Sequence, residues 1–163
     1  MKKIWNSFLH SIRLPQKKSV FYLNRIGMDI NVIYMFILLA IASSPALLEQ
    51  ITSNKQASQQ LHPFFLFIYF FIFYYLIITI IVFCIISLLA YLWTIVAKLL
   101  QRKLRFAILW KMTAYSTTIP FLLFTFISFF YPVSHMFLFI SVFYIIFIVL
   151  KIILIYPKRR RRT

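Results

Sequence analysis

The longest apolar stretch of the chain runs from Pro63 to Ala97 and reads PFFLFIYFFIFYYLIITIIVFCIISLLAYLWTIVA. After its first residue it contains no charged residue, no glycine and no proline. As one helix it would measure roughly 50 Å, more than the roughly 30 Å hydrocarbon core of a bilayer. Two spans would need more residues and a turn signal between them. The stretch therefore predicts one long membrane-spanning helix that is tilted or protrudes from the bilayer.

The rest of the 163-residue chain has the same character, with 63% hydrophobic residues and a formal net charge of +16. Soluble domains carry roughly 45–50% apolar residues, and disordered chains carry fewer. Because Asp29 and Glu49 are the only acidic residues, paired carboxylates for catalysis are not expected. One glycine, Gly27, excludes a glycine-rich phosphate loop, and one cysteine, Cys84, excludes a disulfide framework. The composition predicts an integral membrane protein that is not an enzyme and uses no cofactor.

Four apolar segments are long enough to cross a bilayer, at residues of about 30–48, 64–97, 112–131 and 136–156. The numbers of Lys and Arg before, between and after these segments alternate as 6, 1, 5, 0 and 6, where the last number includes Lys151, just inside the fourth segment. Cytoplasmic loops are enriched in Lys and Arg. We therefore predict an all-α, polytopic helical membrane protein with four transmembrane helices and both termini in the cytoplasm (N-in/C-in). Its expected parts are a cytoplasmic segment (1–29), a membrane domain (30–156) and a basic tail (157–163).

The first residues of the chain have an amphipathic pattern. Apolar residues recur there at helical spacing, namely Ile4, Trp5, Phe8, Leu9 and Ile12. This pattern predicts a short amphipathic helix that ends near Pro15 and lies flat in the cytoplasmic interface. We expect it to act either as a passive anchor or as a docking helix for a partner.

The most distinctive polar cluster opens the third apolar segment and reads TAYSTTIP from Thr113 to Pro120. Pro120 cannot donate a hydrogen bond to the carbonyl of Ser116, so the helix is expected to kink there. Thr113, Thr117 and Pro120 share one helix face. The candidate site is therefore a polar kink formed by Thr113, Ser116, Thr117 and Pro120. Its hydroxyls serve either helix packing or a polar pocket near the cytoplasmic side.

Other polar residues lie near the ends of the apolar segments or outside them. The tail carries a run of basic residues, namely Lys158, Arg159, Arg160, Arg161 and Arg162. Each is attracted to anionic lipid headgroups by about 1 kcal/mol, so we expect the bilayer, and not a nucleic acid, as the partner of this run. Lys151 is expected to extend its ammonium to the cytoplasmic interface. His62, His135 and Glu49 lack metal-ligand spacing, so no metal site is expected.

Two stretches carry a family resemblance. The first reads SIRLPQKK at residues 11–18 and leads through Arg25 and Gly27 to SSP at residues 43–45; the second reads LWKMTAYSTTIP at residues 109–120. Together they resemble a bacterial membrane family, the domain-of-unknown-function 1189 group, which looks related to the Yip-type membrane proteins. The resemblance implies a bacterial inner-membrane protein and supplies no catalytic residues. Some relatives are labelled as sugar-utilisation proteins. Members usually carry a larger outer segment between the first two spans than residues 49–62 provide.

We expect one of two functions. The first is a non-enzymatic membrane scaffold or accessory subunit that binds another membrane protein or a second copy of itself. The second is a small transporter or the membrane subunit of one, and the resemblance implies a sugar-related substrate. Its motivation is the kinked, hydroxyl-rich start of the third apolar segment. An enzyme that acts on lipid would need a nucleophile or a metal set that the sequence does not display.

Overall fold

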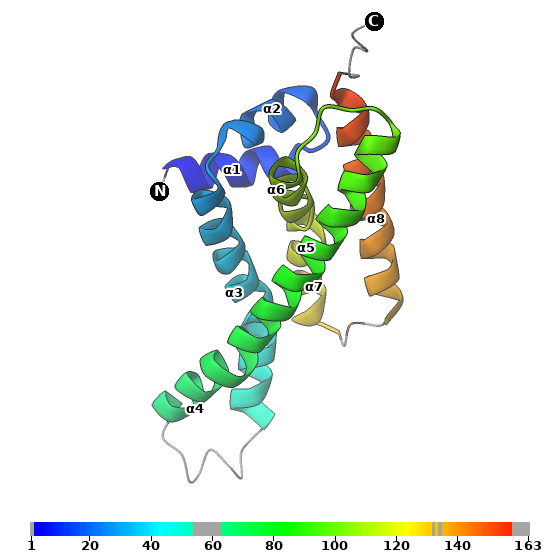
Figure 1. Cartoon of the computed structure of the whole chain (residues 1–163). Helices are drawn as coiled ribbons and strands as arrows, with labels where there is room; N and C mark the ends of the chain where they lie inside the picture. The colour runs from blue at the N-terminus through cyan, green and yellow to red at the C-terminus, as the bar shows by residue number, and fades with distance from the viewer. Residues whose placement is uncertain (1, 54–62, 132, 134, 158–163) are drawn as a thin grey trace, which may run out of the picture.

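The computed structural model describes residues 2–53, 63–131, 133 and 135–157, and its elements are all helical (Figure 1). In chain order they are α1 (Lys2–Ile12), α2 (Lys17–Arg25), α3 (Met28–Ser53), α4 (Pro63–Tyr69), the π-helical η1 (Phe70–Tyr75), α5 (Leu76–Leu99), α6 (Phe106–Ser116), α7 (Thr118–Ser128) and α8 (His135–Ile155). The all-α class expected from the sequence is confirmed.

The helices are arranged between two ends of the molecule (Figure 1). α1 and α2 lie across one end, which also holds the start of α3, the connection between α5 and α6, and the last turn of α8. The chain passes four times between this end and the opposite one: along α3, back along α4–η1–α5, out along α6 and α7, and back along α8. The basic residues of α1, α2 and the α5–α6 connection therefore gather at one end.

Three helices in the described part are long and apolar enough to cross a membrane. They are Met28–Thr52, Phe64–Leu99 and Met136–Ile155. The long second helix expected from the Pro63–Ala97 stretch is confirmed, because α4, η1 and α5 follow one another without a break. The third apolar segment, expected as one kinked helix over 112–131, differs from this expectation in the structure. Its helix begins earlier, at Phe106, and two helices of 11 residues each take the place of a single one.

Two prolines explain why one helix continues and another is interrupted. Pro45 lies inside α3, where it removes the N–H that would bond the carbonyl of Ile41. The hydroxyl of Ser44 donates to that carbonyl instead, at 2.7 Å, and α3 continues. Pro120 likewise removes the N–H that would bond the carbonyl of Ser116, and here the α-helical hydrogen-bond pattern is interrupted at Thr117, between α6 and α7. Thr117 N bonds the carbonyl of Ala114, while its backbone stays in the right-handed helical region.

α6 lies at the centre of the packing. Leu109, Met112 and Tyr115 of α6 are fully buried, and they join the core with residues of α2, α3, α5 and α8. α5 approaches α6 through small side chains, since Ala90 and Ala97 are both buried. Small residues let two helices come close enough for dense packing. The most polar of the apolar segments thus forms the interior of the bundle.

α1 turns serines toward the rest of the protein and leaves most of its expected apolar face exposed. Its buried residues are Ser7 and Ser11, while Trp5, Leu9 and Ile12 are exposed. Ile4 and Phe8 from the expected apolar face do pack against the core, so that face is divided between two environments. Serines suit the buried side because their hydroxyls bond carbonyls within α1, Ser7 to Lys3 and Ser11 to Phe8.

Candidate functional site

The hydroxyl-rich segment is the most deeply buried part of the chain that the structure describes. Every residue from Lys111 to Thr118 is buried, and Thr113 and Thr118 have no exposed surface. Pro120 is buried as well. Thr113, Ser116, Thr117 and Pro120, the candidate site residues, therefore lie together inside the bundle and not on a surface facing lipid or solvent.

Each serine and threonine hydroxyl of this segment bonds the backbone of its own turn. Thr113 donates to the carbonyl of Leu109 at 2.9 Å, and Ser116 donates to that of Met112 at 2.8 Å. Thr117, at the interruption, donates to the carbonyl of Ala114 at 2.7 Å. The bond from Thr117 and a bond of 2.8 Å from Thr118 to the carbonyl of Tyr115 reach the last carbonyls of α6, which lack a full set of partners within the helix.

A tyrosine of α3 connects this segment to α1. The hydroxyl of Tyr34 lies 2.7 Å from the Oγ1 of Thr118 and 3.1 Å from the Oγ of Ser11, and all three residues are buried. The ring of Tyr34 also contacts that of Tyr115, with centroids 5.2 Å apart. One hydroxyl thus links three helices that are distant in sequence. No sequence pattern indicated it, because Tyr34 appears as one more aromatic residue in an apolar segment.

Lys111, one of the five basic residues counted between the second and third apolar segments, lies in a helix and not in a loop. It was expected among the cations of a cytoplasmic loop, yet it is buried in α6. Its Nζ donates to the carbonyls of Asn24 and Ile26, at 2.7 and 2.8 Å, where α2 ends. The last carbonyls of a helix have no partner within the helix and carry the negative end of its dipole, so they are good acceptors for an ammonium.

Four buried side chains make no side-chain hydrogen bond among the described residues, namely Asn31, Trp93, Tyr115 and Tyr156. Tyr115 belongs to the hydroxyl-rich segment, and Asn31 belongs to α3, which packs against it. Both the amide oxygen and the amide nitrogen of Asn31 lack a partner, although the side chain has no exposed surface. The hydroxyl of Tyr115 also makes no hydrogen bond. Asn31 precedes Tyr34 by one helical turn and lies on the same face of α3. An unsatisfied buried polar group costs about 1–3 kcal/mol, so Asn31 and Tyr115 each lower the stability of the core.

The remaining polar residues that the sequence placed near the membrane interfaces form no metal-binding site among the described residues. Among the described residues no three His, Cys, Asp or Glu side chains form a group that could hold a metal. His62 and the run Lys158–Arg162 lie outside the described residues. Lys151 is exposed on α8, and its Nζ lies 4.4 Å from the centroid of the Phe147 ring. The Lys151 ammonium therefore has an aromatic neighbour on the preceding turn.

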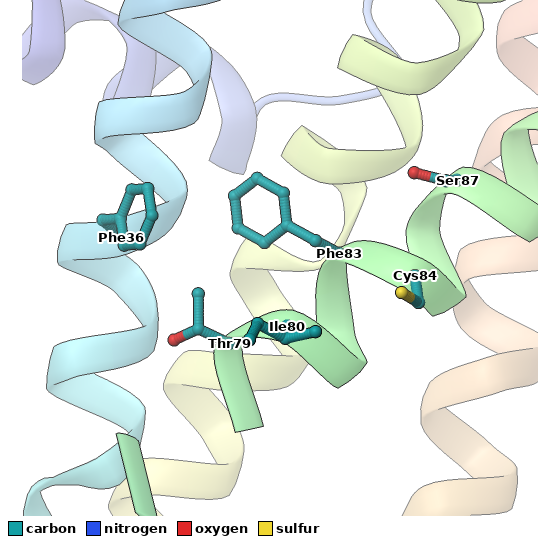
Figure 2. Close-up of a pocket in the computed structure, with 6 residues that line it drawn as sticks. All are labelled: Phe36, Thr79, Ile80, Phe83, Cys84 and Ser87. Atoms are coloured by element: carbon teal, nitrogen blue, oxygen red, sulfur yellow. The ribbon is translucent and has the colours of Figure 1, made fainter. Parts of the chain in front are cut away.

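The structure also contains a groove that the sequence did not indicate. It opens sideways between α3 and α5, has a volume of about 510 Å³, and is lined by Phe36, Thr79, Ile80, Phe83, Cys84 and Ser87 (Figure 2). Its lining is almost wholly apolar. It is distinct from the hydroxyl cluster, since none of the candidate site residues contributes to it.

The fold and site define an all-helical protein with three helices long and apolar enough to cross a membrane and with a buried, hydroxyl-rich helix interruption. The chain belongs to the family described as protein of unknown function (DUF1189), whose model matches residues 49–153, more than half of the chain. The match includes the stretch at 109–120 but begins after the one at 11–18. Comparisons with curated proteins and with solved structures found no match.

Proposed function

We propose that the chain is a non-enzymatic, four-span protein of the bacterial inner membrane that acts as a scaffold or accessory subunit for another membrane protein. In this proposal α3, α4–η1–α5, the α6–α7 pair and α8 are the four spans. Both ends of the chain lie in the cytoplasm, with anionic lipid headgroups around α1, α2 and the basic tail.

The path of the chain supports the four-span topology. It passes four times between two ends, and the end that holds α1 and α2 carries the basic residues of the first segment and of the α5–α6 connection. α6 and α7 together supply 22 helical residues, which is enough for a bilayer core that needs about 20. The Lys and Arg residues at this end support a cytoplasmic position for it.

One observation carries the scaffold function: the longest helix is the least buried. Only 11% of the apolar window of Phe64–Leu99 is buried within the chain, against 39% for α3 and 22% for α8. A stripe of exposed Ile and Leu follows α5 with heptad spacing, at Ile81, Ile85, Leu88, Leu92, Ile95 and Leu99. Such spacing is typical of a seam that packs against another helix. We call it the α5 stripe.

Site-specific photo-crosslinking in intact membranes tests this function. A photoreactive residue at Leu88, which is 62% exposed, is expected to form an adduct with a partner protein of defined mass. The same residue at Ala90, which is fully buried two positions along the helix, is the matched control and is expected to form none. Recovery of Leu88-labelled protein only as a monomer would count decisively against a scaffold.

Cysteine labelling tests the topology. In a Cys84→Ser background, a cysteine at Ser58, between α3 and α4, is expected to react with an impermeant maleimide added to intact cells. A cysteine at Lys103, in the α5–α6 connection, is expected to react only after the cells are lysed. Labelling of both positions from outside would refute the N-in/C-in arrangement.

The helix interruption favours a second candidate, a small transporter or its membrane subunit. Interrupted helices in transporters place polar groups at substrate sites, and here Asn31 supplies an unpaired amide on the α3 face that packs against α6 and α7. Solute flux, tested first with sugars, into liposomes that contain only this protein separates the two candidates. A Pro120→Ala variant restores the missing N–H, and unchanged flux in this variant would remove the interruption from the mechanism.

A further inference from the structure

Contacts join α3 to the η1–α5 helix at one end of the groove, which we call its closed end. Tyr75 Oη donates to the carbonyl of Phe36 at 2.8 Å, which ties the two helices together at the end nearest η1. The rings of Phe36 and Phe83 lie 5.5 Å apart and narrow the groove between its walls. Beyond this point α3 and α5 diverge toward the end that holds α1 and α2 (Figure 1). The two helices that flank the groove therefore separate toward the basic end of the molecule.

The two hydroxyls of the lining each make a hydrogen bond within the protein. The hydroxyl of Thr79 donates to the carbonyl of Tyr75 at 2.7 Å, and the Oγ of Ser87 accepts from Trp110 Nε1 at 2.9 Å. The remaining lining side chains are Phe36, Ile80, Phe83 and Cys84. A polar ligand would lose its hydration without gaining hydrogen bonds here. The part of any ligand inside the groove must therefore be apolar.

The size and depth of the groove match one leaflet. Its volume of about 510 Å³ lies within the roughly 300–1,000 Å³ of small-molecule sites. From Met28 to Phe36, α3 rises about 12 Å, which is less than half of a hydrocarbon core of about 30 Å. The closed end thus lies within the leaflet nearest α1 and α2. That end carries the six basic residues of residues 2–25, which attract anionic headgroups.

We propose that this groove binds one acyl chain of an anionic phospholipid from the leaflet nearest α1 and α2, with the headgroup at the basic end. The proposal rests on the membrane insertion proposed above and is independent of the scaffold role. A helix from a partner or from a second copy would need contacts along both walls. Among the described residues, α3 contributes only Phe36 to the lining.

Cys84, the only cysteine of the chain, lines the groove and reports on its occupancy (Figure 2). The full chain is purified in detergent, and alkylation of Cys84 by N-ethylmaleimide is timed by intact mass with and without phosphatidylglycerol. Only the unoccupied fraction reacts, so occupancy of about nine-tenths slows alkylation about tenfold. The control is Ile85→Cys in a Cys84→Ser background, because Ile85 is 53% exposed on the α5 stripe outside the groove lining, and its rate is expected to stay unchanged.

Equal rates at Cys84 with and without lipid would overturn the proposal, as would equal slowing at both positions. Equal protection of Cys84 by phosphatidylcholine would show that binding does not require an anionic headgroup, and would overturn that part of the proposal. Membrane insertion is judged separately, by recovery of the native chain in the membrane fraction. A chain that is recovered there without protection of Cys84 overturns the lipid site alone.

Native mass spectrometry gives a second test through variants. Cys84→Phe places a ring inside the groove and is expected to lose the phospholipid that the native chain retains. Ile85→Phe adds the same ring on the neighbouring lipid-facing surface and is expected to retain it. Equal retention by both variants would contradict the proposal. A native chain that appears as a lipid-free dimer, and as a monomer in Cys84→Phe, would assign the groove to a second copy instead.

Discussion

Lys111 illustrates how a cation is accommodated in an apolar segment. Its ammonium has no carboxylate partner among the described residues, and it bonds two carbonyls at the end of α2. Because hydrogen bonds to a charged group are stronger than neutral ones, two of them offset part of the desolvation of Lys111. The side chain thereby holds α2 against α6 from inside the bundle.

Lys111→Met keeps most of the side-chain volume and removes both bonds. The carbonyls of Asn24 and Ile26 then lack partners, and we expect the free energy of unfolding to fall by about 1.5–3 kcal/mol. Thermal unfolding in detergent measures the change, and trypsin cleavage within α2 should accelerate. Lys103→Met is the control because Lys103 is exposed in the α5–α6 connection. An equal effect of the two variants would contradict the role of Lys111.

Tyr34→Phe removes the hydroxyl that connects α1, α3 and α7 while leaving the ring in place. We expect a loss of about 1 kcal/mol in the free energy of unfolding, the usual net contribution of a buried neutral hydrogen bond. Tyr91→Phe, at a position that is 62% exposed, should leave stability unchanged. Denaturant unfolding of both variants in the same detergent measures the two free energies of unfolding. Equal values would show that the Tyr34 hydroxyl contributes nothing to stability.

At the scale of the elements, the ends of helices are completed by groups from other parts of the chain. Arg102 donates through its guanidinium to the carbonyl of Tyr156, just after α8, as Lys111 does at the end of α2. α5 ends in a turn in which Arg102 N bonds the carbonyl of Ala97 and Gln101 N bonds that of Lys98. Gln101 has a φ of 53°, a conformation that glycine adopts most easily at this position.

Gln101→Gly should therefore stabilise the chain. Removing the Cβ relieves the left-handed backbone, and part of that gain is lost to the greater freedom of glycine in the unfolded chain. We expect a net increase of about 0.5–1 kcal/mol in the free energy of unfolding, measured by thermal unfolding. Gln101→Ala keeps the Cβ and should give no increase. Equal stabilisation by both variants would show that the backbone conformation is not the cause.

The α1–α2 pair should weaken in acid because of His10. Partial burial lowers the pKa of His10 below its usual 6.5, and the neighbouring charges of Arg13 and Lys18 lower it further. The ring stacks on Tyr22 at 4.1 Å between centroids, and Nδ1 lies 3.2 Å from the Oγ of Ser19. The folded state therefore favours the neutral ring. Its contribution is complete above pH 6.5 and is lost as the pH falls through the lowered pKa.

Protease cleavage between α1 and α2, followed from pH 7.5 to 5, measures this loss. Cleavage should accelerate in the native chain as the pH falls, after correction for the pH dependence of the protease on a peptide. His10→Gln cannot take up a proton and should show a flat profile. A native profile as flat as that of the variant would refute the role of His10.

At the scale of the whole molecule, α5 has two unlike sides. Ala90 is fully buried against the core, whereas Leu88 is 62% exposed on the α5 stripe. Ala90→Leu should overpack the contact with α6 and lower stability by about 1–3 kcal/mol. Leu88→Ala should change the stability of the isolated chain by less than about 0.5 kcal/mol while reducing crosslinking to a partner. Unfolding and crosslinking of both variants test whether Ala90 serves the core and Leu88 serves a partner. A larger loss of stability in Leu88→Ala than in Ala90→Leu would contradict this assignment.

Much of the architecture follows from local sequence features. Long apolar runs predict α3, the continuous α4–η1–α5 helix and α8, because each run must form its backbone hydrogen bonds internally. The Pro120 argument places a change of direction near Ser116, and the helix is interrupted at Thr117. The candidate hydroxyls of that segment are buried together, although the sequence left open whether they serve packing or a pocket.

By itself the sequence determined that this chain is helical and apolar, with its basic residues sorted along it, because run length and charge are local properties. Tertiary structure alone decided which faces are buried. Ser7 and Ser11 turn inward while Trp5 stays exposed, Lys111 enters the core, and Tyr34 bonds a residue 84 positions away. In a chain that is apolar on nearly every face, hydrophobicity does not distinguish the inside from the outside. Which face of a helix is buried depends instead on small residues and on hydrogen bonds between segments that are distant in sequence.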